Sequence, residues 1–422
     1  MDHSACLPAD LLGLCFNNAN CRAVSRAIRN ANLLCTTKLT IDASKWPGYH
    51  GVDHRTCRDE ACVILHKMPC LTNLYLRDWD VPLPVLGGVC TTTLQHLSLS
   101  GCWGVSDLGP IGACSALQHL DLQGCYRVSD LGPIGACNAL RHLDLQGCYR
   151  VSDMRPIGAC NALQHLDLTG CNIVSDFGPL SACTLLHHLS GGRMVSDLGP
   201  IGACSVLQHL DLSGCYRVSD LGPIGACTTL RHLNITRCNK VSDLGPVGSC
   251  AALQHLNLHG CFRVSDLGPI GACNVLQHLD LSGCYMLSDL APIGACSVLQ
   301  HLNLSECHKV ADLGPLGSCT LLQHLNLRGC YRVSDLAPIG ACTALQHLNL
   351  SVCQGVSDLV PIGACTMLRH LNLCGCTRVS DLGPIGAFTM LRHLNLPGCD
   401  RVSDHGPTKA CTMMHVVRRQ RW

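Results

Sequence analysis

Histidine, cysteine and aspartate recur at fixed places along this chain of 422 residues, and all three residue types can do chemistry. The stretch Leu207–Cys227 reads LQHLDLSGCYRVSDLGPIGAC, and close copies of it follow one another at a period of 23 residues. Cysteine and histidine are common zinc ligands, and a carboxylate near an imidazole is a frequent acid–base pair. The first question is therefore whether the repeat copies a reactive site or a structural unit.

The cysteines of the repeat are interpreted as buried structural thiols. When each unit is numbered from its first leucine, cysteine stands at positions 9 and 21, as in Cys215 and Cys227. A zinc site needs four ligands that converge on one point, whereas these cysteines would stack in two columns. Phe388 replaces one position-21 cysteine, and a phenyl ring can fill a core but cannot bind a metal. We therefore expect the repeats to hold no metal and no cofactor.

The aspartate at position 14, for example Asp220, is predicted to cap a turn. It follows a serine and lies two residues before a glycine–proline pair. Side-chain oxygens at such places accept hydrogen bonds from free backbone N–H groups. Catalytic carboxylates come as a pair in distinct environments, whereas these aspartates are equivalent copies. The sequence predicts no catalytic residue.

Histidine occupies position 3 of every unit from Leu94 on, beside leucines at positions 4 and 6. Neighbouring side chains of a strand alternate between its two faces, so positions 3 and 5 should point away from the core. Position 5 is mostly aspartate in the earlier units and asparagine in all the later ones, and arginine enters at position 2 near the end. The candidate partner-binding residues of this surface are His96, His119, Asp121, His142, Asp144, His165, Asp167, His209, Asp211, His232, His255, His278, Asp280, His301, His324, His347, Arg369, His370, Arg392 and His393.

Two interpretations of this surface stay open. The histidines and the position-5 residues could form hydrogen-bonded ladders that only stabilise a sheet, or they could form a strip that binds a partner; a divalent metal on adjacent imidazoles is a minor third alternative. Because a uniform strip offers few distinct hot spots, the irregular first unit with Tyr75, Arg77 and Trp79 is a further candidate for partner binding. We also predict that the fold loosens below about pH 6, because charged neighbouring imidazoles repel one another.

The spacing of the apolar residues predicts the elements that carry these side chains. Positions 4 and 6 alternate with polar neighbours, which indicates a short strand with one buried face. From position 9 the spacing becomes three, and Gly222, Pro223 and Gly225 exclude a long α-helix, which favours 3₁₀ turns. The unit at Leu186 is two residues short, and a kink or a frayed strand is expected near Gly191 and Gly192.

A strand with a tight return leg, repeated at fixed length, is a solenoid coil. The string LQHLDLSGC matches LxxLxLxxN/C and resembles the leucine-rich repeat family over roughly residues 71–413. The return leg VSDLGPIGAC is similar to the short legs of phosphatase-regulator and internalin repeats, and the position-9 cysteine resembles F-box and trypanosomatid leucine-rich-repeat proteins. The resemblance implies an α/β solenoid, a horseshoe with a parallel concave sheet and short 3₁₀ return legs, in which the concave face binds proteins.

The ends of the chain do not repeat. Residues 1–70 are predicted to form an N-terminal helical cap, and Leu7-Pro8 with the leucines that follow resembles the opening of a degenerate F-box. His54, Cys57, Cys62 and His66 have the composition of a zinc site with poor spacing. Two further strands are expected at Lys38–Asp42 and Met414–Val417, and residues 414–422 form a basic tail.

Composition narrows the function classes. The formal net charge of +1 gives no broad field for nucleic acid or an anionic membrane, and no apolar run is long enough to span a bilayer. Thirty-five cysteines without an export signal indicate free thiols in the cytoplasm or the nucleus. We expect a monomeric, non-enzymatic scaffold for protein partners, and the alternatives are an F-box-type substrate adaptor of a ubiquitin ligase or a phosphatase-regulator-like binding protein.

Overall fold

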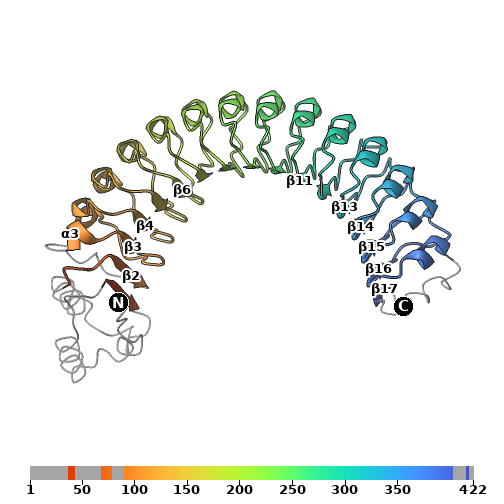
Figure 1. Ribbon diagram of the computed structural model, residues 1–422, viewed down its shortest axis with the longest axis horizontal. Coiled ribbons are helices and arrows are strands. Elements are labelled where there is room, and N and C mark those ends of the chain that lie inside the picture. Colours follow the sequence, from red (N-terminus) through yellow and green to blue (C-terminus); the bar gives the residue numbers. More distant parts are fainter. Residues whose placement is uncertain (1–36, 43–67, 78–89, 403–414, 418–422) are drawn as a thin grey trace, which may run out of the picture. The chain divides into compact units, whose positions relative to one another are not determined.

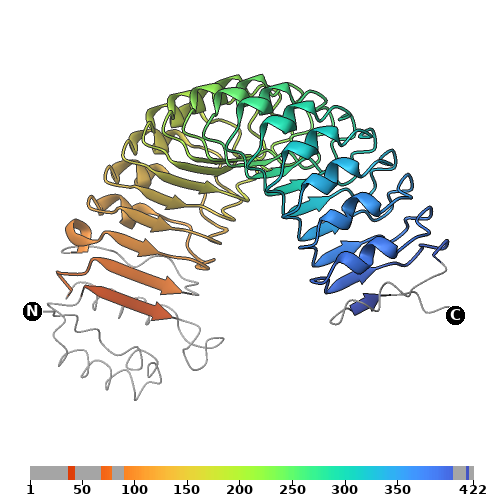
Figure 2. The same ribbon diagram turned by 45° about the vertical axis from the view of Figure 1, so that its right-hand side comes forward.

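The computed structural model describes residues 37–42, 68–77, 90–402 and 415–417. The chain divides into two compact units, Met1–Leu207 and Gln208–Trp422. In each unit one strand per coil lies beside the strand of the next coil, and the return legs stack on the other side of the coil (Figures 1 and 2).

The first unit contains a parallel sheet whose neighbouring strands are consecutive in the sequence. Its strands are β1 (Lys38–Asp42), β2 (Asn73–Arg77), β3 (His96–Ser98), β4 (His119–Asp121), β5 (His142–Asp144), β6 (His165–Leu168) and β7 (His188–Gly191). Its helices are α3 (Cys90–Thr93) and the 3₁₀ helices η4 (Gly109–Ala113), η5 (Gly132–Ala136), η6 (Arg155–Ala159), η7 (Gly178–Ala182) and η8 (Gly199–Ala203).

The second unit repeats the same arrangement, again with parallel strands in chain order. Its strands are β8 (His209–Asp211), β9 (His232–Asn234), β10 (His255–Asn257), β11 (His278–Asp280), β12 (His301–Asn303), β13 (His324–Asn326), β14 (His347–Asn349), β15 (His370–Asn372), β16 (His393–Asn395) and β17 (His415–Val417). Its 3₁₀ helices are η9 (Gly222–Ala226), η10 (Gly245–Ser249), η11 (Gly268–Ala272), η12 (Ala291–Ala295), η13 (Gly314–Ser318), η14 (Ala337–Ala341), η15 (Val360–Ala364) and η16 (Gly383–Ala387).

The fold class predicted from the spacing is confirmed. In the regular coils the apolar positions 1, 4, 6, 9, 12, 15, 18 and 21 fill the interior, and their side chains are almost completely buried. The Leu186 coil departs from this pattern, with Gly191 and Met194 at positions 6 and 9. Every coil places the same residue against its copy in the next coil, as Leu256 pairs with Leu279 between β10 and β11. Each coil therefore buries its apolar side chains against its neighbours, which makes the stability of a solenoid depend on adjacent repeats.

The return legs are 3₁₀ helices, as the spacing of three predicted. In η11 the N–H of Ile270 donates to Leu267 O at 2.8 Å, and the N–H of Cys273 donates to Ile270 O at 2.9 Å. Proline stands at the start of each of these helices, where its missing N–H costs no helical bond.

Of the two alternatives predicted for the short unit, the frayed strand is wrong, whereas the backbone does bend at Gly191 and Gly192. β7 is not frayed: it pairs with β6 through four residues, and Leu168 lies opposite Gly191. Gly191 and Gly192 have φ of 96° and 86°, and a Cβ at Gly191 would collide with the backbone of Leu168. The coil is therefore shortened by two residues at Gly191 and Gly192, at the end of the strand. Glycine tolerates the positive φ at both positions and the close contact between Gly191 and the backbone of Leu168.

Both strands predicted outside the repeats are present. β1 pairs with β2 over the whole of Lys38–Asp42, and β17 pairs with β16 in the register His393 to His415. The predicted helical cap and F-box segment, the zinc-like set at residues 54–66 and the basic end of the tail lie outside the described residues. The boundaries 1–70, 71–413 and 414–422 stay predictions.

Candidate functional site

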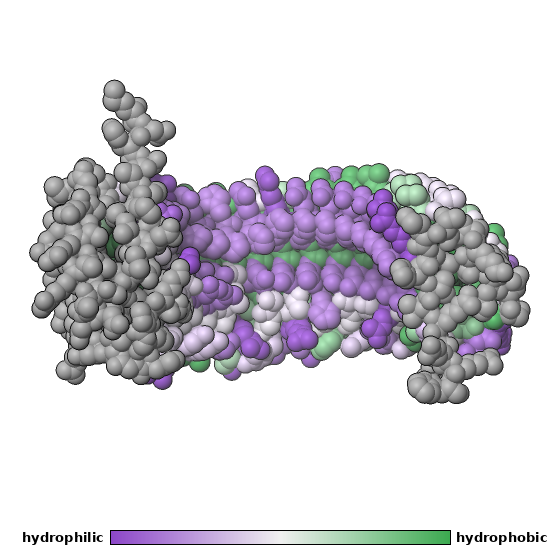
Figure 3. Space-filling model, turned by 90° about the horizontal axis from the view of Figure 1, so that it is seen from below, coloured by the Kyte–Doolittle hydropathy of each residue, from purple (hydrophilic) through white to green (hydrophobic). Residues whose placement is uncertain are grey.

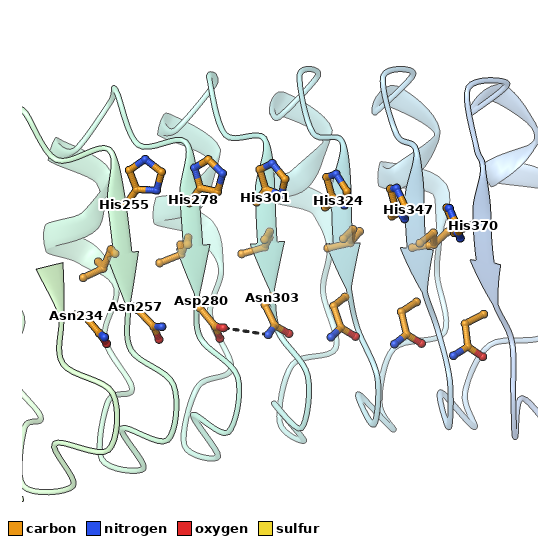
Figure 4. A pocket seen from close by; sticks show the side chains of 18 of the residues that line it. Asn234, His255, Asn257, His278, Asp280, His301, Asn303, His324, His347 and His370 are labelled. Atoms are coloured by element: carbon orange, nitrogen blue, oxygen red, sulfur yellow. Dashed lines mark hydrogen bonds between the residues drawn. The ribbon is translucent and has the colours of Figure 1, made fainter. Parts of the chain in front are cut away.

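The candidate site is the sheet face that bears positions 3 and 5, here called the histidine face. Histidine begins each strand from β3 to β16, leucine follows and points into the core, and the third residue is aspartate, asparagine or serine. Figure 4 shows the resulting rows in the second unit, with the imidazoles along one side and the asparagines and Asp280 along the other. The alternation predicted from LxxLxLxx thus places all the predicted histidines on one surface within each unit.

The imidazoles of neighbouring strands stack on one another. From His232 to His347 successive ring centroids lie 4.2 Å apart with interplanar angles of 10–17°. The rings of His232, His255, His278, His301, His324, His347 and His370 form no hydrogen bond with any described residue, and the buried Nδ1 of His278 has no partner. These seven histidines therefore contact their neighbours by ring stacking and not by hydrogen bonds between side chains.

Several of the stacked imidazoles in the second unit have a strongly lowered pKa. Burial, followed by the charges of neighbouring histidines, lowers the pKa of His232, His278 and His324 to about 4. Burial also lowers the pKa of His142, but Asp121 and Asp167 act in the opposite direction there. At neutral pH the column therefore offers ring nitrogens as hydrogen-bond donors and acceptors without a net charge.

The position-5 side chains accept a backbone N–H just after the end of their own strands. Asn326 Oδ1 accepts the N–H of Arg328 at 3.1 Å, and Asn349 Oδ1 accepts the N–H of Ser351 at 3.0 Å. Links between strands are fewer: Asn303 Nδ2 donates to Asp280 Oδ2 at 3.1 Å (Figure 4), and Asn234 Nδ2 donates to Asp211 Oδ2 at 2.9 Å. The Nδ2 groups of Asn326, Asn349 and Asn372 form no hydrogen bond with a described residue.

A groove of about 880 Å³ runs along this face of the second unit. The histidine row and the asparagine row form its two sides, and the position-4 leucines, such as Leu302 and Leu325, form its floor. Figure 3 shows the same pattern as a narrow hydrophobic strip between two hydrophilic bands. Sequence reasoning assigned these leucines only to the core, because the 2% of their surface that remains exposed leaves no trace in the repeat pattern.

The first unit carries a separate, smaller groove of about 590 Å³. Tyr75 and Arg77 from β2 line it together with His96, His119 and Asp121, so two predicted residues of the irregular unit do join the histidine face. Lys38 on β1 lies over the ring of Tyr75, with Nζ 5.1 Å from the ring centroid. Trp79 lies outside the described residues.

The remaining reactive residue types are structural. The thiol of Cys125 donates to Leu99 O at 3.2 Å and that of Cys137 to Ile111 O at 3.5 Å, and both side chains are fully buried. Burial raises the pKa of Cys137 to about 11, which keeps the thiol protonated and unreactive. Phe388 is fully buried at the same position, as predicted for a core residue. Among the described residues no cluster of three metal-ligating side chains occurs.

The position-14 aspartates cap the turn that leads into the return leg, as predicted. Asp266 Oδ1 accepts the N–H of Gly268 at 2.7 Å, but the residue at the helix boundary is Leu267, which makes no side-chain cap. The aspartate side chain therefore accepts the N–H of the residue two positions later and stabilises the turn that leads into the 3₁₀ helix.

Comparisons with known proteins agree with this architecture. A family model described as "Leucine Rich repeats (2 copies)" matches residues 205–249, and one described as "Leucine Rich repeat" matches residues 159–176. Residues 159–176 and 205–249 thus match leucine-rich repeats, and the fold is that of a leucine-rich repeat solenoid. Such solenoids typically build binding scaffolds. No curated protein matches this chain in sequence.

Several solved structures share the fold. A leucine-rich repeat protein of Leptospira interrogans is 18% identical with a TM-score of 0.62, covering 93% of this chain and 98% of that one. An internalin of Listeria monocytogenes is 22% identical with a TM-score of 0.60, covering 69% and 83%. The functional domain of InlJ from the same organism, which includes a cysteine ladder, is 15% identical with a TM-score of 0.54, covering 86% and 75%. At these identities the likeness shows the fold, and the predicted ties to F-box and trypanosomatid proteins stay predictions.

No helix among the described residues is long and apolar enough to cross a membrane.

Proposed function

We propose that this leucine-rich repeat protein is a non-enzymatic scaffold whose histidine face binds an extended segment of a partner protein. The observation that carries the proposal is the groove of the second unit, which has an apolar floor and unpartnered polar atoms on both sides. Binding sites combine these two features, because apolar surface supplies affinity and a few polar groups fix orientation.

The polar groups of the groove suit a polypeptide backbone. Imidazole nitrogens and amide Nδ2 groups can donate to carbonyls, and neutral imidazoles can also accept from N–H groups. The histidine column of the second unit extends over about 34 Å, given eight ring spacings of 4.2–4.4 Å. This length corresponds to about ten residues of extended chain at ~3.4 Å each.

The free thiols support an intracellular place for this scaffold. The cysteines of positions 9 and 21 in the described coils form no disulfide, and all of them except the half-buried Cys399 are buried. Thiols persist in this form in reducing compartments such as the cytoplasm and the nucleus. We include this location, and a monomeric state, in the proposal.

Affinity capture from the source cell with the full-length chain tests the proposed face. A variant with Asn326→Tyr and Asn349→Tyr narrows the groove, and a matched variant with Ala337→Tyr and Val360→Tyr adds the same rings to exposed sites on η14 and η15. We expect the groove variant to lose the proteins that the wild type and the return-leg variant both capture. Equal capture by all three chains would overturn the proposal.

A further inference from the structure

The last coils of the second unit carry an uncompensated positive charge beside the histidine face. Arg369 and Arg392 stand at position 2 of their repeats, directly before β15 and β16 and next to His370 and His393. Their backbones are linked, because the N–H of Arg392 donates to Arg369 O at 2.8 Å. Arg369 is half-buried with an Nε that has no hydrogen-bond partner, and neither arginine forms an ion pair with a described carboxylate.

Carboxylates are absent from this stretch of the face. Position 5 is asparagine in β12 to β16, so the nearest position-5 carboxylate is Asp280 on β11. Four strand spacings of ~4.8 Å separate β11 from β15, about 19 Å, which exceeds a Debye length of ~8 Å at physiological salt. The return-leg carboxylates of these coils are engaged elsewhere, since Asp358 and Asp381 accept the N–H groups of Val360 and Gly383.

The positive charges of the two arginines lower the pKa of nearby histidines. Burial lowers the pKa of His370, and the positive charges of His393, Arg392 and Arg369 lower it further. His347 on the preceding strand experiences the same effect from burial first and then from His370 and Arg369. An anion placed here would meet two guanidinium groups, unpaired amide Nδ2 groups and no competing carboxylate of the face.

We propose that this end of the groove binds the carboxylates of an acidic polypeptide segment, which fixes the direction in which the partner lies along the histidine face. The inference rests on the proposed function, because the rest of the segment follows the same groove. Guanidinium groups pair with carboxylates through two parallel hydrogen bonds. The neutral imidazoles and asparagines of β12 to β14 suit a backbone, so the acidic residues of the segment gather at one end.

The chain supplies its own control for this site. Arg141 and Arg231 occupy the same position 2 directly before β5 and β9, with N–H groups donating to Gln118 O and Gln208 O in the same way. Both lie near position-5 carboxylates, since Asp144 belongs to the coil of Arg141 and Asp211 to the strand beside Arg231. These arginines should contribute little to the binding of an acidic chain.

The test uses the full-length chain and fluorescently labelled deca-glutamate at low ionic strength, followed by anisotropy. We expect binding that weakens about tenfold in Arg369→Gln/Arg392→Gln and stays within about twofold in Arg141→Gln/Arg231→Gln. Absence of binding, or equal losses in the two variants, would overturn the inference. Deca-uridylate that binds more tightly with the same dependence on Arg369 and Arg392 would also overturn it, in favour of nucleic acid.

A third variant separates this inference from the proposed function. If deca-glutamate binding depends on the two arginines but not on Asn326→Tyr/Asn349→Tyr, the anion site stands and the groove proposal fails. If captured partners require the groove but bind Arg369→Gln/Arg392→Gln as well as they bind the wild type, the groove proposal stands and the proposal of an acidic segment is wrong.

Discussion

In three coils the turn after the strand holds a residue that is poorly suited to the backbone conformation there. Most coils place glycine there with φ of 69–82°, but Arg237, Glu306 and Val352 adopt φ of 59°, 64° and 62°. A β-branched residue is the least suited to this left-handed conformation, which costs roughly 1–2 kcal/mol for a residue with a Cβ. The identical fold of these coils shows that neighbouring repeats impose the turn on whatever residue stands in it.

Replacing Val352 by glycine should stabilise the protein. We expect Val352→Gly to raise the free energy of unfolding by about 1 kcal/mol, because glycine takes φ of 62° without steric cost. The reciprocal change Gly375→Val, in the next coil at φ of 74°, should lower it by a similar amount or more. Urea denaturation followed by circular dichroism measures both, and a destabilised Val352→Gly would contradict this account of the turn.

The thiol columns give a second test with single-residue resolution. Because burial raises the pKa of Cys250 to about 12 and that of Cys342 to about 11, their thiols should not react with a disulfide reagent in the folded protein. Mass spectrometry after brief labelling should find these cysteines unmodified until urea unfolds the chain. Rapid labelling of either cysteine without denaturant would show that the columns are accessible.

The residues also show what the sequence could and could not predict. The burial of the cysteines and of Phe388 followed from the repeat, since each copy occupies the same place in the core. The stacking of the imidazoles did not follow, because a histidine column fits a hydrogen-bonded ladder equally well until the ring orientations are known. The small exposed part of the leucines at the floor of the groove could not be predicted either, because it depends on the same side-chain orientations.

At the scale of the elements, the 3₁₀ return leg depends on the turn that leads into it. Proline and glycine set its shape, and the length of the leg could be predicted from the spacing of three. The capping role of the aspartate could be predicted from its place before the turn, whereas the N–H group that it reaches had to come from the structure. The two-residue deletion before Leu207 was likewise visible in the sequence, but the paired strand β7 that it leaves intact depends on Gly191 and Gly192.

Removing one of these turn carboxylates should weaken its coil. Asp266→Ala deletes the acceptor of the Gly268 N–H, and we expect a loss of about 1 kcal/mol in the free energy of unfolding. Asp266→Asn retains an Oδ1 acceptor and should lose much less. Equal losses in the two variants, measured by urea denaturation, would show that charge rather than the turn hydrogen bond is what matters.

At the scale of the whole molecule, the histidine column makes stability depend on pH. The pKa of His232, His278 and His324 is about 4 in the folded protein, below the ordinary value of 6.5. Between these values the unfolded chain binds more protons than the folded chain, so the free energy of unfolding falls as the pH falls. This stability is fully present above about pH 6.5 and is lost progressively toward about pH 4.

The melting temperature should therefore drop when the pH is lowered from about 8 to about 5. The drop should be smaller in a variant with glutamine at His278, His301 and His324, because these side chains no longer titrate. A melting temperature that does not move between the two pH values would refute the account of the neutral column.

The most direct test of the binding face is histidine footprinting of the full-length chain with and without a captured partner. Diethyl pyrocarbonate modifies neutral imidazoles, and mass spectrometry reports each histidine separately. We predict that the partner protects His255, His301 and His347 on the groove while His259 and His308, off the column, keep their reactivity. Unchanged modification of the column, with protection of His259 and His308 instead, would contradict the proposal that the histidine face binds the partner.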